Sequence, residues 1–125
     1  MKITFKKAIA SLMAFTTLST GAVGFNASAT TVTNPYAMFD YNKSNTFANC
    51  TITNTTSTIR RGQVSMTVYT LDGTKFRSGY GDLGNWESAE CRYNGSIITG
   101  VEFYGTLYFN TQPVGNPVAY WHVTL

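Results

Sequence analysis

Beyond its first 35 residues, the chain follows a pattern in which every second residue is apolar, as at Val64, Met66 and Val68. A period of two is that of a β-strand with one face buried against a core. The same region has no apolar residues at helical spacing, and Thr, Asn, Gly, Tyr and Val are abundant in it. The pattern predicts strands over residues 36–41, 47–53, 63–70, 74–80, 86–92, 96–109 (with a break near Gly100) and 118–124.

About seven short strands separated by turn residues predict an all-β fold. The predicted architecture is a small antiparallel β-sandwich with one disulfide, and a small β-barrel is the alternative. The sequence has no internal repeat and no second domain. We therefore expect residues 30–125 to form a single β domain.

The Asp-Gly pair at residues 72–73 predicts a hairpin turn. A three-residue loop with Gly73 in the left-handed conformation would align Val68 with Phe76, so that both face the core. A two-residue loop would instead put Lys75 and Arg77 on the apolar face of the preceding strand. The three-residue loop is therefore the predicted one, because a slip of one residue moves every side chain to the other face.

The Asn-Gly pair at residues 94–95 predicts a second hairpin, with Cys91 opposite Ile97. Phe109 then faces the core at the end of the following strand. A two-residue turn is the alternative, and it would bury Ile98 and require a bulge near Gly100. Residues 79–84, with the sequence Gly-Tyr-Gly-Asp-Leu-Gly, predict a mobile loop.

The N-terminal region has the features of a secretory leader. Three lysines precede a mostly apolar stretch over residues 8–18, and the region ends in Ala-Ser-Ala at 27–29. The apolar stretch is about half the ~20 residues that a bilayer-spanning helix needs. We expect residues 1–29 to be a signal peptide cleaved after Ala29. The mature protein would then be secreted and extracellular, with no transmembrane segment.

The positive charge of the whole chain, +3, comes from this leader. Three of the nine Lys and Arg residues lie in residues 1–29, which leaves six basic against six acidic side chains in the mature part. A neutral domain lacks the basic surface with which nucleic-acid-binding proteins neutralise phosphates. We therefore expect no nucleic-acid partner.

Cys50 and Cys91 are the only cysteines, and both lie in the mature part. Oxidising compartments outside the cytosol permit disulfides. Both residues occupy inward-facing positions of predicted strands, so we expect one disulfide between them that bridges the two sheets. The alternatives are free thiols and an intermolecular pair.

Residue types that carry catalysis or bind metals are few and dispersed. His122 is the sole histidine and lies near the C-terminus, so a Ser-His-Asp triad has no other candidate base. The acidic residues lack the spacing of a calcium loop or a zinc site. Glu87 and Glu90 are three residues apart on a strand and point to opposite faces, which argues against a glycosidase pair. We expect no enzymatic activity, no catalytic residue, no metal and no cofactor.

Aromatic residues are more numerous than a core of this size can bury, since the mature part holds two Trp, eight Tyr and five Phe. If the last two strands form a hairpin that pairs Leu107 with Trp121 inside, Tyr108 lies opposite Tyr120 outside and Thr106 opposite His122. The predicted binding site on this outer face comprises Tyr104, Tyr108, Tyr120 and His122. The alternative is that these rings only pair with one another across the strands.

A surface rich in Tyr, Asn, Ser and Thr with little charge is similar in composition to an antibody binding site. Aromatic rings and hydroxyl groups are also what a neutral sugar requires. We therefore expect a secreted, non-enzymatic binding module that recognises a neutral glycan or a protein surface.

The short mature chain, the simple leader and the aromatic C-terminus resemble small secreted β-bacteriocins of the lactococcin type. Those bacteriocins are not expected to need a disulfide. The resemblance implies an alternative function as a bacteriocin-like antibacterial or toxin-like small β-protein.

Overall fold

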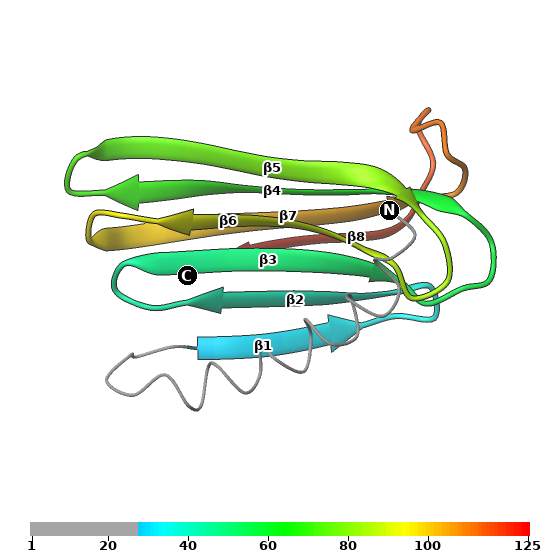
Figure 1. Cartoon of the computed structure of the whole chain (residues 1–125), viewed down its shortest axis with the longest axis horizontal. Coiled ribbons are helices and arrows are strands. Elements are labelled where there is room, and N and C mark those ends of the chain that lie inside the picture. Colours follow the sequence, from blue (N-terminus) through cyan, green and yellow to red (C-terminus); the bar gives the residue numbers. More distant parts are fainter. Residues whose placement is uncertain (1–27) are drawn as a thin grey trace.

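The computed structural model describes residues 28–125, which form eight β-strands (Figure 1). No residue in this range is helical. Within it, no helix meets the length and apolarity that a membrane crossing requires. The strands are β1 Ser28–Thr33, β2 Ala37–Lys43, β3 Phe47–Asn54, β4 Arg60–Thr70, β5 Gly73–Leu83, β6 Ser88–Asn94, β7 Ile98–Tyr108 and β8 Pro117–Thr124.

The strands form two four-stranded antiparallel sheets. Sheet A has the order β1-β2-β3-β6, and sheet B has the order β5-β4-β7-β8. The strands of both sheets run along the long axis of the molecule in Figure 1. The two sheets pack face to face and do not close on each other. The predicted small β-sandwich is therefore confirmed over the barrel alternative.

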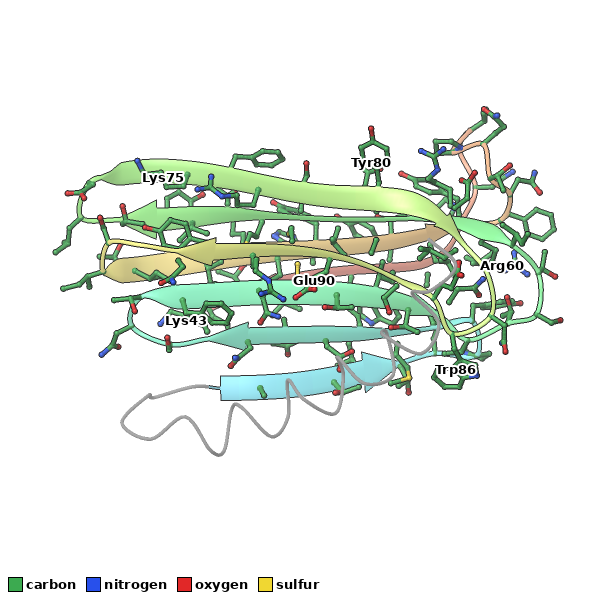
Figure 2. The ribbon with its side chains drawn as sticks, viewed as in Figure 1. Lys43, Arg60, Lys75, Tyr80, Trp86 and Glu90 are labelled. Atoms are coloured by element: carbon green, nitrogen blue, oxygen red, sulfur yellow. The ribbon has the colours of Figure 1, made fainter. Side chains whose placement is uncertain are left out.

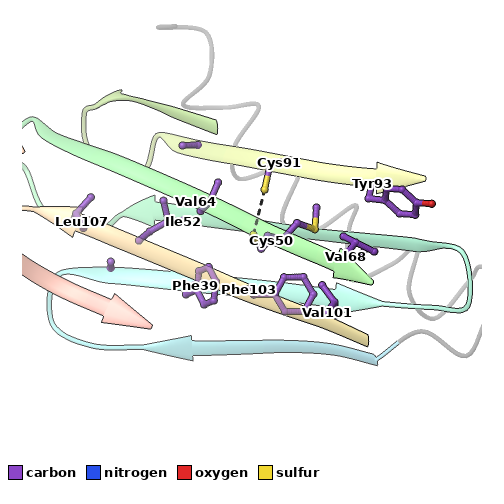
Figure 3. Packing of buried hydrophobic residues seen from close by; sticks show 14 of the residues in the cluster. Phe39, Cys50, Ile52, Val64, Val68, Cys91, Tyr93, Val101, Phe103 and Leu107 are labelled. Carbon is purple, nitrogen blue, oxygen red and sulfur yellow. Dashed lines mark hydrogen bonds between the residues drawn. The ribbon is translucent and has the colours of Figure 1, made fainter. Parts of the chain in front are cut away.

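Alternate residues of both sheets meet in one core, as the period of two predicts (Figure 3). Phe39 and Ile52 of sheet A and Val64, Phe103 and Leu107 of sheet B are completely buried in this core. A fully buried side chain of this size contributes about 1.5–3 kcal/mol relative to an exposed one. Burial of these five side chains therefore holds the two sheets together.

The backbones of the two sheets come into close contact at β5 and β6, the edge strands on one side of the sandwich. A Cβ atom on Gly79 of β5 would lie 2.2 Å from the carbonyl oxygen of Glu90 on β6, so only glycine fits there. Two residues before Gly79 on β5, the guanidinium of Arg77 lies over the Tyr93 ring, 5.6 Å from its centroid. These contacts close the core on this side.

The hairpin between β4 and β5 differs from its prediction. Gly73 has a φ of 115°, so the expected left-handed residue is present. Thr70 pairs with Gly73, however, and Val68 pairs with Lys75 instead of Phe76. The predicted register is wrong, and Phe76 faces outward.

The physical reason is that β5 is an edge strand whose residues are mostly exposed or half-buried, so its inner face does not need to be apolar throughout. Lys75 and Arg77 lie on this inner face. Charged side chains that point inward on an edge strand oppose the addition of another strand. The predicted register depends on apolar residues pairing with apolar residues, and the exposed edge strand β5 does not require this.

The second predicted hairpin does not exist, because β6 and β7 belong to different sheets. The predicted pairing of Cys91 with Ile97 is therefore wrong. Ile98 is buried, Ile97 is exposed, and the register between β4 and β7 shifts near Gly100. The burial of Ile98 and the irregularity near Gly100 agree with the alternative, but its two-residue hairpin turn does not exist. Buried and exposed residues alternate along β6 and β7 whether the two strands pair in one sheet or lie in opposite sheets.

Three element boundaries also differ from their predictions. Residues 79–83 belong to β5, so the predicted mobile loop is instead a strand whose Gly79 contacts β6. β7 ends at Tyr108, and Phe109 is exposed rather than in the core.

β1 was not predicted, because it overlaps the end of the expected leader. Residues 1–27 of that leader lie outside the described residues, and cleavage after Ala29 would leave Thr30–Thr33 of β1 in the mature chain.

Cys50 on β3 and Cys91 on β6 are direct cross-strand partners within sheet A, so the predicted bridge between the sheets is wrong. Their sulfur atoms are 3.6 Å apart and buried, and both residues are thiols in this structure (Figure 3). Facing residues of an antiparallel pair have Cα atoms about 4.5–5.5 Å apart. Disulfides need about 4.4–6.8 Å. A disulfide within sheet A is compatible with this register and stays a prediction.

Candidate functional site

The outer face of sheet B carries all four predicted site residues. The register pairs Gly105 with Trp121 and Leu107 with Ala119 toward the core, so the even-numbered residues from Glu102 to Tyr108 of β7 and from Tyr120 to Thr124 of β8 point away from it. This face therefore holds Tyr104 and Tyr108, which are half-buried, and Tyr120 and His122, which are exposed.

The pairing of β7 with β8 is shifted by two residues from its prediction. His122 lies opposite Tyr104, and Tyr120 lies opposite Thr106. Tyr108 pairs with Pro117, beyond a register shift, so it does not face Tyr120. A shift of two residues keeps every side chain on its predicted face but changes its neighbours.

Tyr104 and His122 stack on each other across the strands. Their ring centroids are 4.3 Å apart, and the ring planes differ by 11°. The predicted alternative, in which outer rings pair across strands, therefore applies to these two residues. Tyr120 lies two residues from His122 on the same face and is 57% exposed.

Three side chains of this face converge on the carboxylate of Glu102. The Tyr104 hydroxyl donates a hydrogen bond to Oε1 over 2.7 Å, and the Tyr69 hydroxyl donates one to Oε2 over 3.3 Å. His122 Nε2 lies 3.6 Å from Oε1. Strand alternation puts Glu102 on the outer face but does not reveal which hydroxyl groups meet there, so Glu102 was not among the predicted site residues.

These contacts shift the pKa values of the cluster. The hydrogen bond from Tyr104 lowers the pKa of Glu102, and the same bond raises the pKa of Tyr104. The negative charge of Glu102 raises the pKa of Tyr69. Because the pKa of Glu102 is lowered, its ionised form stabilises the fold above the unfolded-state pKa. That contribution is lost as the pH falls through the folded-state pKa.

Rings from β4 and β5 extend the surface beyond the predicted site. Tyr80 pairs with Gln63 and Phe76 pairs with Thr67, so both rings point outward together with Tyr69. Tyr80 and Phe76 are 69% and 61% exposed, and Tyr80 stands away from β5 in Figure 2. We call this surface the aromatic face, and its residues are Tyr69, Phe76, Tyr80, Tyr104, Tyr108, Tyr120 and His122.

The prediction missed Phe76 and Tyr80 because the three-residue loop turned both toward the core. The alternative two-residue loop would place Phe76 and Tyr80 on the outer face, where the structure has them. The signal that could have found them is the pair Lys75 and Arg77, whose positions suit the inner face of an edge strand.

Small polar side chains lie between the rings. Gln63, Ser65 and Thr67 of β4 and Thr106 of β7 share the outer face. The charged groups on this face are Glu102 and, at one end, Arg61 and Asp82, which form an ion pair over 2.9 Å.

Comparison with protein-family models, with curated proteins and with solved structures finds no match for this chain. Functional inference therefore depends on the surface itself. Within residues 28–125, no three His, Cys, Asp or Glu side chains are grouped so that they could hold a metal ion.

Arg60 lies at one end of the sandwich (Figure 2) and is 7% exposed, with its guanidinium over two aromatic rings. The Tyr36 and Phe109 ring centroids are 5.5 and 5.3 Å from its guanidinium carbon. It also donates hydrogen bonds to Thr56 Oγ1 and to the Phe109 carbonyl oxygen. These contacts tie three loops together, so we assign Arg60 a structural role.

Replacing Tyr104 by Phe is expected to raise the pKa of Glu102 toward its ordinary value, because the substitution removes the hydrogen bond that lowers it most. An NMR titration of the Glu102 carboxyl carbon measures this change. Tyr108→Phe is the matched control, since Tyr108 lies on the same face outside the Glu102 cluster. Equal pKa values of Glu102 in both variants would contradict the cluster geometry.

Proposed function

We propose that this protein is a non-enzymatic binding module whose aromatic face recognises a neutral glycan. The observation that carries the proposal is the gathering of seven rings on the outer face of one sheet, several of them largely exposed. Soluble domains rarely leave so much aromatic surface together unless it contacts a ligand or a partner.

The chemistry of the aromatic face suits sugar rings. Tyr80 and Tyr120 lie at the two ends of one row across the sheet, with Gln63 and Thr106 between them. An aromatic ring offers an apolar surface for stacking, and a phenol adds a hydrogen-bonding group. The hydroxyl and amide groups between the rings can exchange hydrogen bonds with sugar hydroxyls. The near absence of net charge on the face favours a neutral ligand over an anionic one.

We further propose that the module acts outside the cell, after export directed by residues 1–29, with a Cys50–Cys91 disulfide. The lysine-rich start, the apolar stretch and the Ala-Ser-Ala end of the leader support export. Mass spectrometry of protein collected outside the cell should give a chain that begins at Thr30. A chain that keeps Met1 and stays inside the cell would contradict this part of the proposal.

A glycan array followed by calorimetric titration tests the binding function. Tyr104→Ala and Tyr120→Ala are each expected to weaken binding of a neutral oligosaccharide by about 1–2 kcal/mol, or roughly 5- to 30-fold. Each substitution removes a ring from the aromatic face, and neither leaves a cavity in the core.

Tyr36→Ala provides the matched control, because Tyr36 is a partly exposed tyrosine outside the aromatic face. Its affinity for the same oligosaccharide should equal that of the unaltered protein. An equal loss of affinity in all three variants, or no binding to any neutral glycan on the array, would overturn the proposal. Inhibition of bacterial growth by a protein that binds no glycan would favour the bacteriocin-like alternative.

A further inference from the structure

Within residues 28–125, the core is closed on one side and open on the other. Along β5 and β6 the backbones touch at Gly79, and the core residues Cys91 and Tyr93 of β6 are buried. The partly buried hydrophobic residues that pack against the core all lie on β1, β2 and β8, and they are Val32, Tyr41, Val118, Trp121 and Val123. The partly exposed apolar side chains at the margin of the core therefore lie along the side formed by β1 and β8.

The two sides also differ in charge. The edge strands of the closed side carry Lys75, Arg77, Glu90 and Arg92. The sequence of β8, Pro-Val-Ala-Tyr-Trp-His-Val-Thr, has no Lys, Arg, Asp or Glu. Charges on edge strands prevent edge-to-edge association, and an uncharged, partly apolar edge lacks that protection.

The hydrogen-bond pattern identifies which backbone groups of β8 are free to pair. Val101 and Leu125 exchange both backbone hydrogen bonds. In an antiparallel ladder such residues alternate with residues whose N–H and C=O groups point away. The odd-numbered residues of β8 therefore bond to β7, and its even-numbered residues point to the open edge. The Val118 carbonyl follows this rule and accepts a hydrogen bond from Asn34 Nδ2 over 3.2 Å.

We propose that β8 pairs with β8 of a second copy of this chain, antiparallel and about a two-fold axis at His122. In this register His122 faces its own copy, and Tyr120 faces Thr124 of the second copy. Every N–H and C=O group of these three residues then has a partner. A register centred on Trp121 would use Val118, whose carbonyl already bonds to Asn34. β8 carries no Lys, Arg, Asp or Glu whose like charges would repel between two identical copies.

The pairing joins sheet B of both copies into one continuous eight-stranded sheet. It also brings the two aromatic faces side by side, with the stacked Tyr104 and His122 of each copy at the junction. A ligand that spans the two-fold axis would contact both copies. Pairing through a free strand edge is a common way for β-proteins to bind each other.

Light scattering after size exclusion, over a range of protein concentrations, tests the dimer. The unaltered protein should change from monomer to dimer as its concentration rises. His122→Pro removes an N–H group that points away from β7, so the β7–β8 ladder is preserved while the dimer loses its central bonds. Its dimer dissociation constant should rise by at least about tenfold.

Thr124→Lys provides a second variant that does not depend on tolerance of proline, because a lysine at the edge opposes pairing. Thr106→Lys is its matched control. Thr106 lies on the same outer face, but on β7 in the interior of the sheet, so this variant should still form dimers. A monomer at all concentrations up to millimolar, or a dimer that tolerates both His122→Pro and Thr124→Lys, would overturn the proposal.

Discussion

Replacing Phe39 by Ala is expected to lower the free energy of unfolding by about 3–5 kcal/mol, the usual cost of removing a large buried ring. Phe39 is fully buried on β2 and stacks on Trp121 of β8, with ring centroids 5.6 Å apart and nearly parallel planes. Its ring also fills the space over Gly105, where a Cβ atom would lie 2.4 Å from it. The substitution therefore leaves a cavity between the two sheets.

Urea denaturation followed by circular dichroism measures this loss as a lower midpoint with an unchanged m-value. Phe76→Ala is the matched control, because it makes the same chemical change at an exposed position on β5. Its effect should stay within about 0.5 kcal/mol. If both variants lost equal stability, the assignment of Phe39 to the core and of Phe76 to the outer face would be wrong.

Oxidation of Cys50 and Cys91 to a disulfide is expected to stabilise the fold by about 4 kcal/mol relative to the reduced protein. The bond would close a loop of about 42 residues, whose unfolded ensemble loses conformational entropy. The hydrogen bond with Cys91 is the largest cause that raises the pKa of the Cys50 thiol, and burial raises it further. Because the thiolate is the reactive form, we expect oxidation to occur before the pair is fully buried.

Denaturation midpoints with and without reductant measure this contribution. The double variant Cys50→Ala with Cys91→Ala is the control, and its midpoint should not depend on the reductant. An intact mass that corresponds to two free thiols in exported protein would contradict the predicted disulfide. Equal midpoints of the unaltered protein with and without reductant would contradict it as well.

The sequence predicted the faces of most residues of β4, β7 and β8 correctly. Val64 and Leu107 are buried where strand alternation places them, and Tyr104 and Tyr120 lie outside as expected. Alternation succeeds in β4, β7 and β8 because one side of each strand must exclude water. The predicted site residues were therefore assigned to the correct surface, although their cross-strand neighbours were not.

Strand alternation does not specify which strands pair. Cys91 could have faced a residue of β7 across a hairpin, yet β6 pairs with β3, far away in the sequence. Either arrangement buries the same alternate residues, so the local pattern cannot distinguish them. The same limit hid the rings of Phe76 and Tyr80, whose orientation depends on β5 being an edge strand.

The order in which the chain visits the two sheets has a consequence for how the domain unfolds. The first three strands belong to sheet A, the next two to sheet B, then β6 returns to sheet A before β7 and β8 finish sheet B. The strands that complete each sheet are therefore separated in the sequence by strands of the other sheet: β4 and β5 lie between β3 and β6, and β6 lies between β5 and β7. Partial structures would leave long strand edges without partners, so we expect both sheets to be gained and lost together in a single cooperative transition.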